Sequence, residues 1–286
     1  MSMVDSTPSA PSSTGGPVDL LVIGGTGLLG QALLRAGDGS RQVAATHHTT
    51  PRHGAGWFQL DLTDPSATQD LIRRLRPRSI INAAYVQRGP NLESVTAQAP
   101  GVIASAAAEI GARYVHLSSD TVFDGTDKAP YNEACPPNPI NDYGNAKLRA
   151  EKLVARNCPG AVIVRTSLLW RASVDGGPQV DLVRDPSMTF FNDEIRNPLN
   201  VDVLASACLE LVDRTDIVGV LHVAGSDAVD RLTFAQHLAA VVGIDPNRLK
   251  GAPGGAVAGR AQNCSLDSSR AKRLLATALP GILSPR

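Results

Sequence analysis

A glycine-rich turn near the start of the chain constrains its fold most strongly. The stretch Gly-Gly-Thr-Gly-Leu-Leu-Gly at residues 24–30 follows an apolar run and opens a segment of helical character. In such a unit Gly24 permits the tight turn, Gly27 lets the backbone approach a pyrophosphate, and Gly30 lets the helix pack against the strand. The helix N-terminus then faces the negative charge. The alternative is a glycine-rich turn that binds no ligand. We predict dinucleotide contacts from Gly24, Gly27, Leu28, Leu29 and Gly30.

From residue 18 onward, short apolar runs alternate with longer helical segments, the pattern of a parallel sheet covered on both faces. The predicted strands are Val18–Ile23, Gln42–Thr46, Ser79–Asn82, Arg113–Leu117, Ala161–Thr166 and Val218–Val223. The predicted helices lie near Leu28–Ala36, Pro65–Leu75, Gln98–Ile110, Tyr143–Arg156 and Val201–Asp213. Six strands and five crossovers form an α/β fold, a doubly wound sheet of the Rossmann type. Its ligands are expected beyond the carboxyl ends of the strands.

Three segments do not fit this sheet: 124–142, 171–197 and the part after residue 225. We expect a dinucleotide-binding domain at residues 18–170 and 198–225, and a smaller substrate-binding lobe at residues 171–197 and 226–286. Residues 1–17 are rich in Ser, Thr, Pro and Gly, and they lack the basic and apolar regions of a signal peptide. We therefore expect a disordered tail there.

The amino-acid composition argues against nucleic acid and membranes as binding partners. The 27 Lys and Arg balance the 27 Asp and Glu, so no broad basic field favours nucleic acid or an anionic membrane. The four cysteines are scattered, and the histidines at 47, 48 and 53 have no neighbouring Cys or carboxylate, so we expect no metal site. Reduced thiols in the cytoplasm are the simplest interpretation of these cysteines. The expected partner is a small molecule. The sequence does not determine the oligomeric state, for which a homodimer is one option.

The end of the second predicted strand indicates which cofactor the turn binds. A dinucleotide fold that prefers NAD usually places Asp or Glu there, but no acidic residue occurs from Gly39 to Leu60. Thr46, His47, His48, Thr49 and Arg52 stand where a 2′-phosphate would lie, which favours NADPH over NADH. The alternative is a solvated basic loop. Further cofactor contacts are expected from Asp61 and Leu62, near the adenine, and from Asn82, Ala83 and Ala84, at the end of the third strand.

Tyr143 and Lys147 are four residues apart and share one face of a predicted helix. A lysine ammonium at ~4 Å, in an effective dielectric of ~20, favours the phenolate by about 4 kcal/mol and lowers a phenol pKa of ~10 by roughly 3 units. Tyr143 could then protonate a substrate oxygen near neutral pH. Ser119, just past the fourth strand, could hold that oxygen. The predicted reaction is hydride transfer to a ketone, with Lys147 also binding the nicotinamide ribose. The alternative is a structural Tyr and a solvated Lys.

Seven blocks in this order resemble the dTDP-4-dehydrorhamnose reductase family, an extended branch of the short-chain dehydrogenase/reductases. They are Gly24–Gly30, Ile81–Ala84, Ser118–Gly125, Pro139–Lys147, Val164–Ser167, Asp193–Pro198 and Gly219–His222. By this resemblance Ser119 takes the place of the family's catalytic Thr, and Tyr143 and Lys147 match its Tyr and Lys. The resemblance implies NADPH and a nucleotide-sugar whose 4-keto group is reduced.

The substrate side departs from the family pattern, because Leu168 stands where the family usually has Trp. Trp170 would point to the same face if this stretch is a strand. Arg196 and Arg260 are candidates for a substrate diphosphate. The expected substrate contacts are Tyr85, Ser119, Asp120, Trp170, Arg196 and Arg260.

Two other functions are compatible with the same residues. A nucleotide-sugar epimerase uses the same Tyr and Lys. A family relative is the noncatalytic, NADP-binding regulatory subunit of methionine adenosyltransferase. A dehydratase is disfavoured, because Thr121 stands where the required Glu would follow Asp120.

Overall fold

The computed structural model describes residues 17–283, except 38, 40, 53, 55, 127–129, 172–176, 255, 256 and 258. The predicted tail lies outside the described residues but for Pro17, and so does His53.

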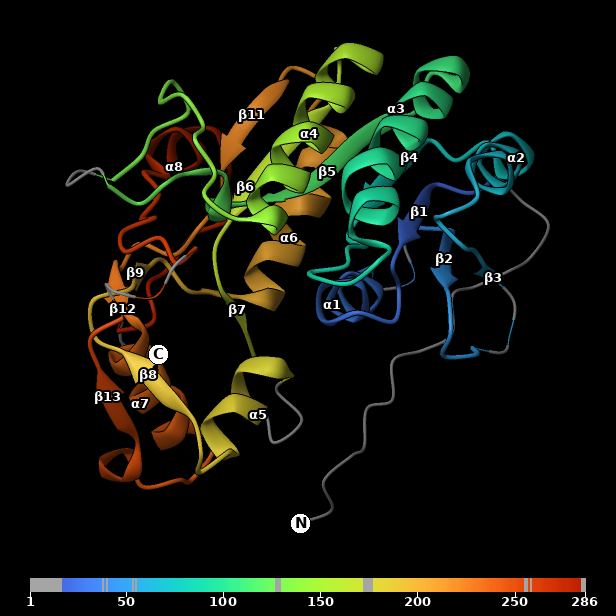
Figure 1. Cartoon of the computed structure of the whole chain (residues 1–286). Helices are drawn as coiled ribbons and strands as arrows, with labels where there is room; N and C mark the ends of the chain where they lie inside the picture. Colours follow the sequence, from blue (N-terminus) through green and yellow to red (C-terminus); the bar gives the residue numbers. More distant parts are fainter. Residues whose placement is uncertain are drawn as a thin grey trace.

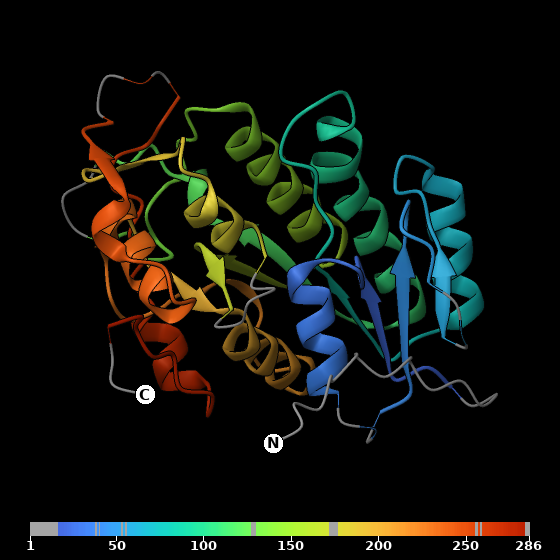
Figure 2. The same cartoon turned by 90° about the horizontal axis from the view of Figure 1, so that it is seen from below.

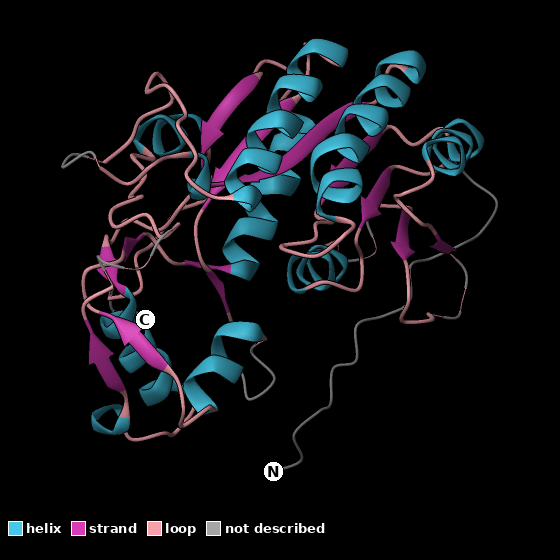
Figure 3. Ribbon diagram, viewed as in Figure 1, coloured by secondary structure: helices cyan, strands magenta, loops and turns pink. Residues whose placement is uncertain are grey.

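The centre of the molecule is one parallel sheet of seven strands (Figures 1 and 3). The strands are β1 (Leu20–Ile23), β2 (Val43–His47), β3 (Trp57–Gln59), β4 (Ser79–Asn82), β5 (Arg113–Ser119), β6 (Val162–Thr166) and β11 (Gly219–His222). Their order in space is β11-β6-β5-β4-β1-β2-β3, so the chain moves outward from β1 to β3 and then returns to place β4 on the other side of β1. The carboxyl ends of β1 and β4 therefore form the switch point where such sheets bind ligands.

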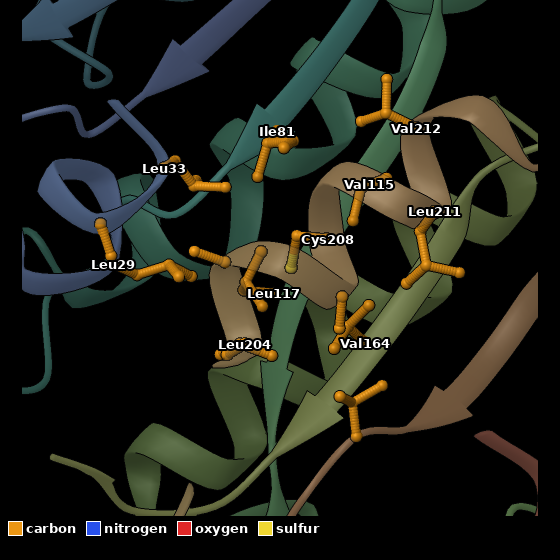
Figure 4. Packing of buried hydrophobic residues seen from close by; sticks show 14 of the residues in the cluster. Leu29, Leu33, Ile81, Val115, Leu117, Val164, Leu204, Cys208, Leu211 and Val212 are labelled. Atoms are coloured by element: carbon orange, nitrogen blue, oxygen red, sulfur yellow. The ribbon is translucent and has the colours of Figure 1, made fainter. Parts of the chain in front are cut away.

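Helices cover both faces of the sheet, because successive strand residues point to opposite sides. Five helices do so: α1 (Leu28–Ala36) and α6 (Val201–Asp213) on one face, and α2 (Pro65–Leu75), α3 (Ala99–Ile110) and α4 (Asp142–Asn157) on the other. Leu20 and Val22 of β1 point toward α1 and α6, whereas Leu21 and Ile23 point toward the other layer. Figure 4 shows the first of these cores, in which Leu33 of α1 and Leu204 of α6 pack with strand side chains.

The α/β prediction is confirmed, with a few differences in the elements. The short strand β3 was missed, because its three residues are only partly covered and follow a glycine-rich loop. The fourth predicted strand runs two residues further, so Ser119 is the last residue of β5, whereas the prediction placed it just past the strand. A π-helical segment, η1 (Leu92–Gln98), precedes α3 at residues for which, except Gln98, no helix or strand was predicted.

Beyond the carboxyl ends of β5 and β6, the later segments build a smaller lobe (Figure 2). Its elements are α5 (Pro178–Arg184), β8 (Thr189–Phe191), β9 (Ile195–Arg196), β12 (Val229–Asp230), α7 (Arg231–Val241), η3 (Pro246–Arg248) and β13 (Lys250–Ala252). Strand β7 (Leu169–Trp170), which pairs with β10 (Leu199–Asn200), connects it to the large sheet. The last helix, α8 (Ser269–Leu274), returns to the large domain, since Ala271 and Leu275 pack in the core beside α6.

No helix among the described residues is long and apolar enough to cross a membrane. Nor does this part of the chain gather three or more metal-binding side chains at one place.

Candidate active site

The glycine turn has the geometry that the sequence predicts. Gly24 has φ +85°, and a Cβ there would lie 2.8 Å from the backbone nitrogen of Ala84. A Cβ on Gly30 would lie 2.2 Å from the carbonyl oxygen of Gly24, so α1 can pack on the turn only through glycine. Gly27 differs, because its Cβ would meet only that same oxygen, at 3.4 Å, and would otherwise project into open space.

A cavity of about 250 Å³ opens beside this turn. Of the predicted cofactor residues, Gly24, Gly27, His47, His48, Asp61, Leu62, Ala83 and Ala84 line it, together with Tyr85. The N-terminus of α1 has no side-chain cap and no acidic residue in its first turn. Its free N–H groups and the space beside Gly27 fit a pyrophosphate, which helix N-termini bind well. The buried Nδ1 of His47 finds no hydrogen-bond partner among the described residues.

The remaining predicted cofactor residues do not line the cavity. Leu29 is buried in the core, and Gly30 packs against the turn. Asn82 is 1% exposed and accepts a hydrogen bond from the backbone N–H of Ala84, so it shapes the strand end. Leu28 packs against the core as well, and Arg52 is exposed outside the cavity lining.

The fold also brings a carboxylate to the end of β2 that the sequence order does not place there. Asp61 follows β3, the neighbour of β2, and its Oδ2 lies 3.7 Å from Nε2 of His48. Its other oxygen accepts hydrogen bonds from the backbone N–H and the hydroxyl of Thr63, which lower the pKa of the Asp61 carboxyl. Both side chains are about half exposed, so the pair is weak and open to a ligand.

Tyr143 and Lys147 lie on the first turns of α4, at the carboxyl end of β5. Asn141 caps this helix by accepting a hydrogen bond from the N–H of Gly144. Gly144 packs on the backbone of Thr121, where a Cβ would lie 2.1 Å from a carbonyl oxygen. Lys147 Nζ lies 5.8 Å from the centre of the Tyr143 ring and donates a 2.8 Å hydrogen bond to the carbonyl oxygen of Leu117.

Tyr85 connects this pair to the cavity. Tyr85 is 56% exposed. The centre of its ring lies 5.9 Å from the centre of the Tyr143 ring and 5.4 Å from Lys147 Nζ. Because Tyr85 also lines the cavity, the Tyr143–Lys147 pair adjoins the space at the glycine turn.

The predicted lowering of the Tyr143 pKa is wrong for the protein without ligands. Burial raises the pKa of this phenol well above 10, and Tyr85 and Asp120 raise it further. Burial also lowers the pKa of Lys147 to about 8, against the opposing effect of Glu151. Desolvation thus outweighs the attraction between ammonium and phenolate.

Ser119 lies in a dense hydrogen-bond network with Asp120. The Ser119 hydroxyl donates to Asp120 Oδ1 at 3.1 Å, and Asp120 Oδ2 accepts a 2.6 Å hydrogen bond from Ser167. The Asp120 carboxyl is 4% exposed, and burial raises its pKa while Arg196 opposes that rise.

Arg196 is held by the protein itself. A guanidinium has five N–H groups. Those of Arg196 face the backbone carbonyl oxygens of Ile195, Gln262 and Ala261, the carboxylate of Glu194 at 3.3 Å and that of Asp120 at 3.6 Å. With its side chain 7% exposed and every donor facing an acceptor, Arg196 joins the two lobes and has no N–H left for a substrate.

Two other arginines beside Glu194 are more available. Arg260 is 43% exposed, stacks 4.4 Å from the centre of the Phe191 ring and contacts Glu194 through Nε. Arg231 donates its backbone N–H to the carbonyl oxygen of Glu194. No carboxylate or carbonyl of the described residues lies within bonding distance of the Arg231 guanidinium. Burial lowers the pKa of this group to about 10. The charge of Arg231 is therefore not neutralised by a direct partner.

The structure places Trp170 in the core of the smaller lobe, where it is 7% exposed. Its indole nitrogen has no hydrogen-bond partner among the described residues. Leu168, at the position of the family's Trp, packs against the same core.

Sequence reasoning missed several residues of the site. Thr26, Thr63, Val86, Asn91 and Val95 line the cavity, and Ser167, Glu194 and Arg231 surround Asp120 and Arg196. The position of Ser167 directly after β6 was the available signal, because ligands gather at strand ends. Arg231 gave none, since its neighbours are far away in the sequence.

Known proteins resemble this chain along most of its length. The family model described as RmlD substrate binding domain matches residues 18–281. A dTDP-4-dehydrorhamnose reductase from Mycolicibacterium smegmatis is 30% identical, over 81% of this chain and 71% of its own length. Methionine adenosyltransferase 2 subunit beta from Bos taurus is 28% identical, over 89% of this chain and 82% of its own.

A solved structure has the same fold. The dTDP-4-dehydrorhamnose reductase of Bacillus anthracis, crystallised with NADP, superposes with a TM-score of 0.79 at 22% identity, over 93% of this chain and 96% of its own. With its fold, its glycine turn and the match over residues 18–281, the chain belongs to the dTDP-4-dehydrorhamnose reductase family.

Proposed function

We propose that the chain is an NADPH-dependent reductase that reduces the keto group of a nucleotide-sugar. The observation that carries this is the position of Tyr143 and Lys147 at the carboxyl end of β5, beside the cavity of the glycine turn. An enzyme that reduces a ketone to an alcohol with a nicotinamide cofactor needs a proton donor next to its cofactor site. The smaller lobe, at residues 171–197 and 226–268, would hold the substrate against that donor.

The cavity residues support the cofactor part of the proposal. The N-terminus of α1 and the space beside Gly27 would hold the pyrophosphate, and Asp61, Leu62, Ala83 and Ala84 would border the adenosine. His47, His48 and Arg52 would bind the 2′-phosphate. His48 would then contact the phosphate in place of Asp61. When bound, NADPH supplies the hydride. The NADP held by the Bacillus anthracis relative agrees with this choice.

Tyr143 would act as the general acid. Its raised pKa keeps the phenol protonated at neutral pH, so the proton is present when the substrate oxygen gains negative charge. Ser119 would donate a hydrogen bond to the same oxygen, and the Lys147 ammonium would stabilise the charge.

Arg260 and Arg231 would bind the substrate's diphosphate. Asp120 and Glu194 are already occupied by Arg196 and Arg260, which leaves one guanidinium charge without a direct partner in this cluster. Phosphate is the anion that guanidinium groups match best. Tyr85, with its exposed ring beside Tyr143, would cover the sugar.

NADPH consumption with a panel of keto-sugar nucleotides, dTDP-4-keto-6-deoxysugars first, tests the proposal. We expect one NADPH to be consumed per ketone reduced, and Tyr143→Phe to abolish turnover while NADPH still binds. Product formation without net NADPH consumption would indicate an epimerase instead.

A regulatory role is the second candidate, since the similarity to methionine adenosyltransferase 2 subunit beta extends over 89% of the chain. Three results together would support the regulatory role. No keto-sugar nucleotide would react, and NADPH would bind equally well to wild type and Tyr143→Phe. The chain would also alter the activity of a methionine adenosyltransferase catalytic subunit.

A further inference from the structure

Ser119 makes three hydrogen bonds, and two of them come from one residue. The backbone N–H of Thr121 donates to Ser119 Oγ at 3.2 Å, and the Thr121 hydroxyl donates to the same oxygen at 3.0 Å. The third is the hydrogen bond from Ser119 to Asp120 Oδ1, at 3.1 Å.

The directions of these bonds follow from the donors that each group has. A serine hydroxyl has one hydrogen and two lone pairs, and an ionised carboxylate only accepts. Arg196 and Ser167 favour the ionised form of Asp120, so the single Ser119 hydrogen goes to Asp120. Both lone pairs of Ser119 are then filled, one by the backbone N–H and one by the hydroxyl of Thr121.

We propose that Thr121 is a positioning residue that keeps Ser119 a hydrogen-bond donor toward the substrate's carbonyl oxygen. The proposal rests on the proposed reductase function. With no lone pair free, the Ser119 hydroxyl cannot turn to accept a hydrogen bond from water or from a substrate hydroxyl. A carbonyl oxygen, which only accepts, is the group that Ser119 remains able to bind. As that oxygen gains charge, it competes with Asp120 for the same hydrogen.

The placement of Thr121 supports this role. It lies in the 3₁₀ turn η2 (Asp120–Val122) that Ser119 itself caps, and the start of α4 packs on its carbonyl oxygen through Gly144. The residue that orders Ser119 thus also supports the helix that carries Tyr143. Without the Thr121 hydroxyl, the backbone bond would remain and Ser119 would regain one lone pair.

A double-mutant cycle tests the proposal. Thr121→Val removes the hydroxyl at nearly constant shape. We expect it to lower kcat about fivefold, the effect of one hydrogen bond, with little change in the KM values for keto-sugar and NADPH. Thr121→Ser, which keeps the hydroxyl, should retain activity near wild type. In a Ser119→Ala background, Thr121→Val should have no further effect, because Thr121 acts through Ser119.

Thr126→Val is the matched control, since the Thr126 hydroxyl makes a similar local bond to Asp124 outside the site, and it should leave kcat unchanged. An unchanged kcat in Thr121→Val would overturn the proposal, and so would an equal loss in both backgrounds. In either case the reductase function would stand. If the wild type reduces no keto-sugar nucleotide, the reductase function fails and this proposal fails with it.

Discussion

The Lys147 ammonium donates a 2.8 Å hydrogen bond to the carbonyl oxygen of Leu117, which ties the second turn of α4 to β5. This bond holds a positive charge at a site that is 3% exposed, and burial lowers the Lys147 pKa from 10.5 to about 8. Glu151, one turn further along α4, only partly offsets the effect of burial. Burial of the Lys147 ammonium therefore lowers the free energy of unfolding at neutral pH.

This cost predicts a pH dependence of stability. Between pH 8 and pH 10 the unfolded chain keeps the Lys147 proton and the folded chain has lost it, so the free energy of unfolding rises with pH. Relative to Lys147→Met, the wild type should gain roughly 2 kcal/mol over this interval. Urea unfolding of both proteins at pH 7, 8 and 10 measures the difference. A constant difference would mean that burial does not shift this pKa.

Two glycines of the turn should respond differently to alanine. Gly30→Ala places a methyl group 2.2 Å from a carbonyl oxygen, so it should displace α1 and lower the melting temperature by several degrees or prevent folding. Gly27→Ala meets only one atom, at 3.4 Å, and its φ of −73° suits alanine. We expect Gly27→Ala to fold normally and to bind NADPH at least tenfold more weakly, because its methyl group fills the pyrophosphate space. Thermal unfolding and NADPH titration measure the two effects, and unimpaired NADPH binding by Gly27→Ala would rule out this pyrophosphate site.

Local patterns predicted the fold where neighbours in the sequence decide the structure. The predicted bounds of α1 and α2 match the structure residue for residue. The Asp64 cap and Pro65 begin α2, and glycines flank α1. Strand β3 has no such signal, because three residues cannot establish an alternating pattern.

The site was predictable only in part, for the same reason. The Tyr143–Lys147 spacing is local and could be seen on one helix. The partners of Arg196 are not local, since Asp120 lies in η2, directly after β5, and Ala261 follows β13, 65 residues beyond Arg196. Arg196 was predicted to bind the substrate diphosphate, because the sequence does not reveal the carbonyl and carboxylate oxygens that the fold brings to its guanidinium. The Tyr143 pKa was misjudged likewise, because burial depends on the whole fold.

The buried pair Arg165–Glu151 should be important for stability. The two side chains are 4% and 5% exposed and are joined by two hydrogen bonds of 2.7 and 2.9 Å, and Ser118 donates a third bond to Glu151. Arg165→Met leaves the Glu151 carboxylate buried without its partner, which should cost about 3 to 5 kcal/mol of unfolding free energy. The comparison is Arg149→Met, on the same helix as Glu151. It breaks a half-exposed pair with Glu93 and should cost less than about 1 kcal/mol of unfolding free energy. Equal losses in urea unfolding would contradict the assignment.

The basic residues after β2 should set the cofactor preference. His48→Ala combined with Arg52→Ala removes two groups that we place at the 2′-phosphate, so KM for NADPH should rise about tenfold or more while KM for NADH changes little. Arg78→Ala is the control, because Arg78 pairs with Asp19 at the opposite end of the sheet. If both KM values rise together, these residues contact a part that the two cofactors share.

The three arginines near Glu194 should separate into two kinds when each is replaced by Met. Arg231→Met and Arg260→Met remove guanidinium groups that retain free N–H donors, so each should raise KM for the nucleotide-sugar about tenfold and leave KM for NADPH and the melting temperature nearly unchanged. Arg196→Met removes donors to three carbonyl oxygens and two carboxylates, so it should lower the melting temperature strongly. Steady-state kinetics with both substrates and thermal unfolding give the required readouts. A rise in nucleotide-sugar KM with Arg196→Met alone, at wild-type stability, would return the diphosphate contact to Arg196 and show that its network opens when substrate binds.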